Sequence, residues 1–256
     1  MSDAFLLQAS GLNKQFGAVV AAQDINVKIR QGERVSLIGS NGAGKTTFVN
    51  MITGYVKPDQ GQIAYAGQNI SGMNPRQITR LGVARSFQIP QLYPSMSVLD
   101  NMLVAQACHD NRLSLWRDAR TAHAVARAEQ VLTRFRLQDQ RHRTVAELPG
   151  GMRKLLDIAL AMTGEPRLLL LDEPTSGVAA EEKFPMMDTI MRVLGNEPLT
   201  ALFVEHDMDI VRGYADRVIA FYSGRVIADA APEQALANDD VRRYVTGDLK
   251  QEPSHA

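Results

Sequence analysis

Hydrophobic and polar positions alternate near both ends of the chain. In the stretch QDINVKIRQGE, Ile25, Val27 and Ile29 are separated by polar residues. Because successive side chains of a strand point to opposite faces, this alternation predicts half-buried antiparallel strands in the first thirty residues. The later stretch ADRVIAFYSGRVIADA predicts a β-hairpin that turns at Ser223 and Gly224.

Continuous apolar runs of strand length replace the alternation in the middle of the chain. They are VSLI at 35–38, LLLL at 168–171 and ALFV at 201–204, with helical periodicity between them. Such runs are typical of strands that are covered on both faces in a parallel sheet. The sequence therefore predicts an α/β fold with a mixed, mainly parallel sheet and an antiparallel β flank.

A helical segment interrupts this α/β pattern. Residues 101–147 show no strand pattern, and apolar residues recur there at helical spacing, namely Val125, Ala128, Leu132 and Phe135. We expect a helical subdomain at about 98–163 within a single domain of residues 1–248, followed by a loose tail at 249–256. The basic stretch 134–143 fits a solvated helix end better than a nucleic-acid site.

Composition narrows the class of protein. The chain has 256 residues, 45% of them hydrophobic, which predicts a globular protein with a full core. Its 28 basic side chains equal its 28 acidic ones, so no bulk charge favours nucleic acid or an anionic membrane. No apolar run reaches membrane-spanning length, and the start MSDAFLLQAS does not resemble an export signal. The single cysteine, Cys108, fits a reducing cytoplasm, and we expect it to fill a helical core.

The stretch GSNGAGKTT fits the phosphate-loop pattern G-x-x-x-x-G-K-[ST] and lies between a predicted strand and a predicted helix. Its glycines allow backbone amides to surround phosphate, Lys45 adds a charge for the β and γ phosphates, and the Thr46 hydroxyl suits Mg²⁺. ATP and Mg²⁺ are therefore the predicted cofactors. The residues expected to bind the nucleotide are Gly39, Ser40, Asn41, Gly42, Ala43, Gly44, Lys45, Thr46 and Thr47.

Two further predicted strands end on ionisable residues. Asp172 and Glu173 follow the run LLLL, and His206 follows ALFV. Ligands of doubly wound sheets bind beyond the carboxyl ends of the strands, so Asp172 would lie near the metal and Glu173 near a water that attacks the γ-phosphate. An acidic pair at a strand end is otherwise a helix cap, and a single histidine is otherwise structural.

The stretch LPGGMRKLLDIALAM, residues 148–162, predicts a helix that lacks the usual opening residue. Apolar residues recur at helical spacing, namely Met152, Leu155, Leu156, Ala159 and Leu160. Gly150 and Gly151 stand at its start, where Ser, Thr, Asp or Asn would otherwise cap the free amides. These amides are therefore candidates for binding another group.

The order of these motifs, together with the glutamine of RSFQIPQ, resembles that of an ABC-type ATPase, the nucleotide-binding subunit of a transporter. The likeness covers almost the whole chain. The stretches RSFQIPQLYPSMSVLDNMLVAQ, DEPTSGVAA and GRVIADAAPEQALANDDVRRYVTGD are most similar to the ATP-binding proteins of branched-chain amino acid importers, of the longer, LivG-like type. A P-loop kinase would need neither the double glycine nor this order of motifs.

The resemblance implies a role for each motif residue. Phe16 of KQFGA would stack on adenine, although a core aromatic at a strand end is an equal alternative. Gln88 would contact Mg²⁺ or water and report to a membrane partner. Asp172 would hold Mg²⁺, Glu173 would polarise the attacking water, and His206 would contact the γ-phosphate. The catalytic residues that the resemblance implies are Lys45, Gln88, Glu173 and His206. The metal contacts that it implies are Thr46, Gln88 and Asp172.

The resemblance also implies partners. Gly150 and Gly151 would face the ATP held by a second subunit, in a head-to-tail homodimer or a heterodimer with a related ATP-binding subunit. Integral membrane permeases would place the protein at the inner face of the cell membrane, with a solute-binding protein as an indirect partner. The alternatives are a soluble ABC ATPase that acts on nucleic acid or ribosomes and a low-turnover ATP-dependent regulator. The chain has no net positive charge that would favour the first alternative.

Two residues depart from the family pattern. Pro149 stands where the family usually has serine, and its ring offers a phosphate neither a hydroxyl nor an amide. We therefore expect weaker ATP-driven closure and slower hydrolysis. Ala179 stands where many relatives have an aspartate in the loop that couples the two ATP sites, which reduces the expected coupling.

Overall fold

The computed structural model describes residues 5–110, 120–195 and 199–247. The chain divides into two compact units, the first formed by Met1–Ile78 with Val204–Ala256 and the second by Thr79–Phe203. Along the chain, α2 (Pro75–Arg80) spans the point where the first unit gives way to the second. The expected tail at 249–256 lies outside the described residues, and the expected single domain with an inserted subdomain stays a prediction.

An antiparallel sheet forms the start of the first unit. Its strands are β1 (Phe5–Phe16), β2 (Val19–Arg30), β4 (Gln60–Tyr65) and β5 (Gln68–Asn69), in the order β2-β1-β4-β5. Ile25, Val27 and Ile29 of β2 are buried while their neighbours are exposed. The predicted antiparallel flank is therefore confirmed.

The first unit also contains a mixed set of strands. In it, β3 (Arg34–Ile38) pairs in parallel with β9 (Arg217–Tyr222), which pairs antiparallel with β10 (Arg225–Ala230). Ser223 and Gly224 connect β9 to β10 with φ of 47° and 75°. Two successive positive φ angles match the right-handed twist of a hairpin, so the predicted turn is confirmed.

Helices pack on these strands within the first unit. They are α1 (Lys45–Ile52), α7 (Met208–Tyr214), α8 (Pro232–Ala237), α9 (Asp239–Val241) and the π-helix η4 (Arg242–Thr246). Phe48 of α1 packs against Phe221 of β9, with ring centroids 5.5 Å apart. Tyr244 of η4 stacks on Tyr222 at 4.2 Å. These contacts secure β9, the strand beside β3.

Three strands of the second unit lie in the order β8-β7-β6. They are β6 (Val83–Ser86), β7 (Leu168–Asp172) and β8 (Thr200–Val204). β6 and β7 run parallel, and the apolar runs of β7 and β8 are buried along their length. The prediction of buried parallel strands from continuous apolar runs is therefore confirmed.

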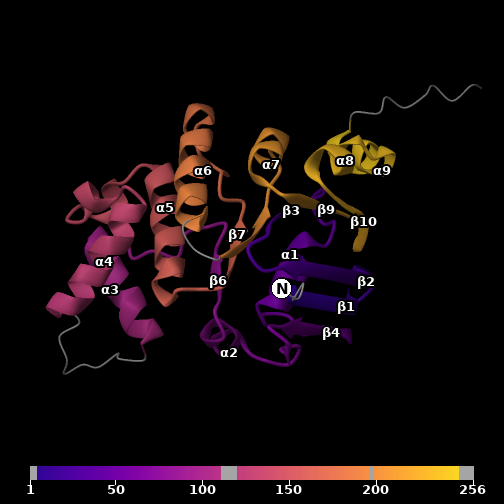
Figure 1. The fold of residues 1–256 in the computed structure, drawn as a ribbon, viewed down its shortest axis with the longest axis horizontal. Helices are drawn as coiled ribbons and strands as arrows, with labels where there is room; N and C mark the ends of the chain where they lie inside the picture. The colour runs from indigo at the N-terminus through magenta and orange to yellow at the C-terminus, as the bar shows by residue number, and fades with distance from the viewer. Residues whose placement is uncertain (1–4, 111–119, 196–198, 248–256) are drawn as a thin grey trace, which may run out of the picture. The chain divides into compact units, whose positions relative to one another are not determined.

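The helices α3, α4 and α5 group together in the second unit (Figure 1). The bounds of the helices of this unit are α3 (Val98–His109), α4 (Ala122–Arg134), α5 (Gly150–Ala161), α6 (Ala180–Gly195), η1 (Gln138–Gln140), η2 (Val145–Glu147) and η3 (Met162–Gly164). The side chains of Ser97 and Thr121 cap α3 and α4 by accepting backbone N–H groups. The described part of the segment predicted to be helical contains α3, α4 and α5, and turns with the short 3-10 helices η1 and η2 connect α4 to α5.

Cys108 does not fill a helical core, contrary to our expectation. It is exposed on the last turn of α3. The residues that α3 buries are Val98, Leu99, Asn101, Met102, Leu103 and Gln106. Cys108 is in phase with Asn101, but in the last turn it lines an open pocket with Asn101 and Ala105 instead of being covered.

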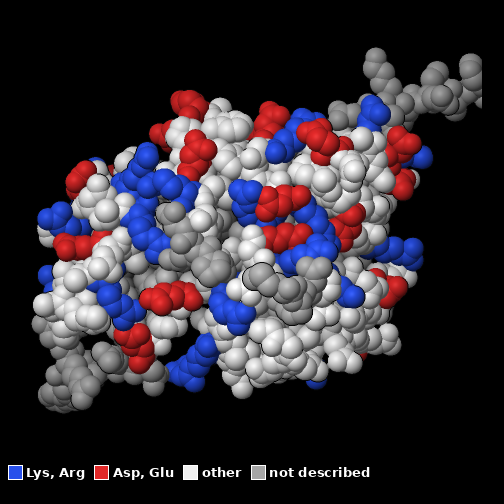
Figure 2. All heavy atoms as spheres, viewed as in Figure 1, with Lys and Arg blue, Asp and Glu red and all other residues white. Residues whose placement is uncertain are grey.

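Basic and acidic side chains are interspersed on the surface. On the face shown in Figure 2, Lys and Arg side chains lie among Asp and Glu side chains. In the basic stretch 134–143, Arg143 donates to the carbonyl of Glu147, and Arg141 lies 3.5 Å from Glu129. These local contacts support a solvated helix end. Among the described residues, no helix is both long enough and apolar enough to cross a membrane.

The start of β3 is tied to the residue before β9 by an ion pair between Arg34 and Asp216. Partial burial raises the pKa of Asp216, but hydrogen bonds from the side chain and backbone of Arg34, with its charge, outweigh burial and leave this pKa below its usual value. Stability from this pair is therefore full above the pKa of an unfolded aspartate and is lost as pH falls through the folded value.

We expect Asp216→Asn to lower the free energy of unfolding at pH 7 by less than about 1 kcal/mol, since the pair is partly exposed and screened. The difference from the unchanged protein should shrink as pH falls below about 4. Urea unfolding at several pH values measures it. A difference that stays constant with pH would show that the charge of Asp216 has no part in it.

Candidate functional site

The predicted phosphate loop joins β3 to α1 in the first unit. Gly39, Gly42 and Gly44 have φ of 150°, 78° and 110°. A Cβ atom at Gly39 would lie 2.4 Å from the carbonyl oxygen of Phe221, and one at Gly44 would lie 2.7 Å from that of Ala21. Both the backbone angles and the close approach therefore require glycine at the first and last of these positions.

α1 begins at the end of this loop with Gly44 as its N-cap, and no described side chain caps it. Lys45 is buried, and its Nζ donates to the carbonyl oxygens of Gly39 at 2.6 Å and Ser40 at 3.0 Å. The ammonium group is thus held against the loop, and Thr46 is exposed at the start of α1. A positive helix end, glycine amides, an ammonium and a hydroxyl form a donor set that fits a nucleotide phosphate with Mg²⁺.

Two other predicted site residues of the first unit are exposed. Phe16, at the end of β1, is 49% exposed, so the alternative of a core aromatic is wrong. The Nζ of Lys14 lies 5.3 Å from its ring centroid. His206 is the second residue after β8 and is exposed, and its backbone N–H donates to the carboxylate of Glu205 at 3.1 Å. The roles of both residues stay predictions.

Asp172, the last residue of β7, forms an ion pair within the second unit. Its Oδ2 accepts a hydrogen bond from the Arg85 guanidinium at 2.6 Å, and both side chains are only about a tenth exposed, at 11% and 10%. The sequence analysis missed Arg85. The signal available was a charged residue inside β6, in the stretch VARSFQ, since a charge buried in a strand needs a partner.

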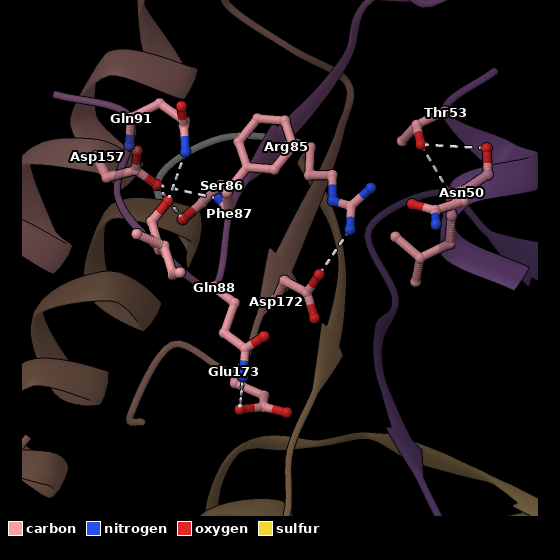
Figure 3. Close-up of polar contacts among 12 residues, drawn as sticks. Asn50, Thr53, Arg85, Ser86, Phe87, Gln88, Gln91, Asp157, Asp172 and Glu173 are labelled. Atoms are coloured by element: carbon pink, nitrogen blue, oxygen red, sulfur yellow. Dashed lines mark hydrogen bonds and ion pairs between the residues drawn. The ribbon is translucent and has the colours of Figure 1, made fainter. Parts of the chain in front are cut away.

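Gln88 and Glu173 are brought together in the second unit. Figure 3 shows their side chains pointing toward one another, and Gln88 Nε2 donates to Glu173 Oε2 at 2.7 Å. Glu173 has φ of 49°, a left-handed conformation that is uncommon for a residue other than glycine. Such strain is found at functional sites, where the surrounding structure holds the residue in place. Two of the predicted site residues, Gln88 and Glu173, therefore lie within hydrogen-bonding distance of one another, and their roles stay predictions.

α5 begins on the double glycine, as predicted. Its N-cap is Pro149, and no described side chain caps the helix. Gly150 is exposed and lines a cleft of about 380 Å³ together with residues of the segments after β6 and β7, among them Gln88, Lys154, Ser176 and Gly177. The helix start therefore faces a hollow rather than a packed surface.

The buried side of α5 differs from the predicted one. Leu156 and Ala159 are buried, but Met152, Leu155 and Leu160 are only partly so. The rest of the buried side includes two charged residues that the sequence analysis missed, Lys154 and Asp157. The signal for them was a charged pair spaced by three residues inside the apolar run KLLDIALA.

Comparison with known proteins settles the family. A family model described as ABC transporter matches residues 22–176, which is more than half of the chain. The chain belongs to the ABC transporter family. Its cassette is of the ATPase type, as the resemblance of the motifs implied.

Relatives match this cassette over nearly its whole length. The high-affinity branched-chain amino acid transport ATP-binding protein LivG of Escherichia coli K12 is 36% identical over 95% of this chain and 98% of its own. The protein BraF of Pseudomonas aeruginosa, with the same description, is 34% identical over 95% and 98%. The ADP conformation of MJ1267, an ATP-binding cassette of an ABC transporter, superposes with a TM-score of 0.83 at 29% identity, covering 94% of this chain and 98% of that one. The predicted fold class is confirmed.

Two glycines of the phosphate loop allow a matched test of its geometry. Gly39→Ala meets both a strained φ and the carbonyl of Phe221, whereas nothing lies within 4 Å of a Cβ atom at Gly42. We expect the first substitution to lower the free energy of unfolding by more than about 3 kcal/mol and Gly42→Ala by about 1 kcal/mol. Urea unfolding measures both. Equal losses would mean that the close approach at Gly39 is not a constraint.

Proposed function

We propose that this cassette binds and hydrolyses Mg-ATP to energise an importer of branched-chain or other hydrophobic amino acids. LivG and BraF, whose descriptions name branched-chain amino acid transport, share its length and over a third of its residues. This chain would serve in the same way, as one of two ATP-binding subunits on integral membrane permeases at the cytoplasmic face of the membrane. A solute-binding protein would deliver the amino acid.

The residues of the phosphate loop, 39–47, would hold the triphosphate, with Lys45 at the β and γ phosphates and Phe16 stacked on adenine. Thr46, Gln88 and Asp172 would contact Mg²⁺. When bound, Mg²⁺ neutralises charge on the phosphate oxygens. The fit of the donor set in the phosphate loop, and the carboxylate of Asp172 at the end of a buried strand, support this assignment.

Glu173 would draw a proton from the attacking water, and His206 would contact the γ-phosphate. In the structure, the carboxylate of Glu173 accepts the amide of Gln88 at 2.7 Å. A glutamate that is held in this way has a fixed position, and its two oxygens can accept a further hydrogen bond from a water while the bond to Gln88 remains. Gln88 is thereby placed to report whether Glu173 is engaged.

The observation that carries the proposal is the start of α5. A helix N-terminus has free N–H groups and a positive partial charge, both of which favour an anion. Because Gly150 is exposed and no described side chain caps the helix, an outside anion can occupy this end. In a head-to-tail dimer, that anion would be the γ-phosphate of the ATP held by the other subunit.

The cleft beside α5 supports contact with a permease. Ile89 is 75% exposed and Tyr93 is 54% exposed, and Ile89 lines the cleft next to Gln88. Ile89, Pro90, Leu92 and Pro94 line the cleft together, and such a run of apolar residues in a hollow is typical of a surface that a partner covers. A permease segment in this cleft would contact the residues that flank Gln88.

Copurification tests the proposal as a whole. The tagged chain, purified from native membranes and identified with its partners by mass spectrometry, should bring down two hydrophobic permeases, and the complex in vesicles should take up leucine when ATP is supplied. Hydrolysis that is stimulated by RNA or DNA, with no permease bound, would instead favour a soluble ATPase that acts on nucleic acid.

We expect Glu173→Gln to reduce kcat for ATP hydrolysis at least about a hundredfold, because the group that accepts the proton is lost. The variant should still bind ATP and form an ATP-dependent dimer, measured by size-exclusion chromatography with light scattering. Glu181→Gln, at an exposed position on α6, is the matched control and should hydrolyse ATP at the unchanged rate. Full activity of Glu173→Gln would exclude it as the catalytic base.

We expect Pro149→Ser to strengthen ATP-driven dimerisation and to raise kcat. A hydroxyl at the N-cap of α5 adds a hydrogen bond to a charged group worth about 1.5 to 3 kcal/mol, or a ten- to hundredfold change. Pro149→Ala removes the ring without adding a donor and serves as the control. If serine and alanine give the same turnover, the hydroxyl has no role at this position.

A further inference from the structure

Two buried charged residues of the second unit have no role in the proposed binding and hydrolysis of ATP. Lys154 and Asp157 lie one turn apart on α5, and each residue is only 5% exposed. Burying charged groups costs free energy unless they are hydrogen-bonded. The hydrogen-bond partners of Lys154 and Asp157 therefore indicate which part of the structure these buried charges hold in place.

Lys154 binds the backbone on two segments. Its Nζ donates to the carbonyl oxygen of Gln88 at 2.5 Å and to that of Glu173 at 3.2 Å, and it lies 3.5 Å from that of Phe87. One ammonium therefore joins the segment after β6 to the segment after β7. These are the segments whose side chains meet in the Gln88–Glu173 hydrogen bond.

Asp157 accepts hydrogen bonds from the segment after β6, whose carbonyls Lys154 binds. Its Oδ2 accepts hydrogen bonds from the Ser86 hydroxyl at 2.6 Å and the Phe87 N–H at 3.1 Å, and its Oδ1 accepts from the Gln91 N–H at 3.0 Å. Figure 3 shows Asp157 beside Ser86, Phe87 and Gln91, which precede and follow Gln88 in the sequence. Burial raises the pKa of Asp157, while these hydrogen bonds and Lys154 oppose the rise.

We propose that Lys154 and Asp157 are positioning residues that make the Gln88 segment move with α5. We call this pair, with the backbone of residues 86–91, the α5 clip. The inference rests on the proposed function, because it gives α5 two connected tasks. Its first turn presents Gly150 and Gly151, and its second and third turns hold the backbone on either side of Gln88.

Through the α5 clip, a phosphate bound at the start of α5 would affect the hydrogen bond between Gln88 and Glu173. A displacement of α5 carries the carbonyl of Gln88 and the amides of Phe87 and Gln91, since the clip bonds all three. Because Lys154 bonds the carbonyl of Glu173 as well as that of Gln88, the position of its ammonium sets the distance from the side chain of Gln88 to the carboxylate of Glu173. The clip thus links the start of α5 to the hydrogen bond that engages the proposed catalytic base.

The test is a double-mutant cycle on ATP hydrolysis in the full chain. We expect Lys154→Met to lower kcat about tenfold or more, because Gln88 loses its position, while ATP affinity, measured by titration with a fluorescent ATP analogue, changes less than about threefold. In a Gln88→Ala background, Lys154→Met should lower kcat less than about twofold, since the residue it positions is gone.

The matched control is Thr189→Val. Thr189 is buried in the same unit, and its hydroxyl bonds the Pro185 carbonyl within α6, away from the clip. This substitution should leave kcat unchanged. Equal losses of kcat from Lys154→Met with and without Gln88 would overturn the inference and leave the proposed function standing.

Amide hydrogen exchange gives a readout that does not depend on hydrolysis. In Asp157→Asn, which also serves in the cycle if Lys154→Met does not fold, the amides of Phe87 and Gln91 should exchange at least about tenfold faster. The amide of Tyr93, held by Asn101 at 2.8 Å, should not change. Equal acceleration at all three amides would mean general loosening and would refute the clip, whereas a chain without ATPase activity would refute only the proposed function.

Discussion

Backbone amides at the start of a helix must find an acceptor, and the two helices of this cassette that begin on predicted site residues have no described side-chain cap. α1 begins after Gly44 in the first unit, and α5 begins at Gly150 in the second. Each end has free N–H groups and a positive partial charge, which together favour an anion. The carbonyls of Phe221 and Ala21 require glycine at positions 39 and 44, and Gly150 is exposed at the start of α5. The ATP chemistry proposed here depends on that constraint.

The two acidic residues at the end of β7, Asp172 and Glu173, are each held by a side chain of the chain itself. Arg85 pairs with Asp172, and the amide of Gln88 donates to Glu173. These partners fix the positions of both carboxylates, and a carboxylate has enough lone pairs to keep such a partner and also bind a metal or a water. Lys154 bonds the backbone of both Gln88 and Glu173, so α5 helps to hold these positions.

Patterns that depend on local chemistry could be predicted from the sequence. The apolar runs predicted buried strands, the glycines and Lys45 predicted the phosphate loop, and Ser223 with Gly224 predicted a hairpin turn. Features that depend on distant partners could not. Arg85, Lys154 and Asp157 are buried only because β6, β7 and α5 meet in space, and periodicity indicates an apolar side but not which charges lie on it. Cys108 and Phe16 show the same limit, since exposure is decided by packing.

A structure of the Glu173→Gln variant with Mg-ATP tests the central claim most directly, by crystallography or cryo-EM. The account predicts a head-to-tail dimer in which the amides of Gly150 and Gly151 from one copy contact the γ-phosphate that Lys45 of the other copy holds. A dimer in which both glycines face solvent, or a monomer with ATP bound, would contradict it.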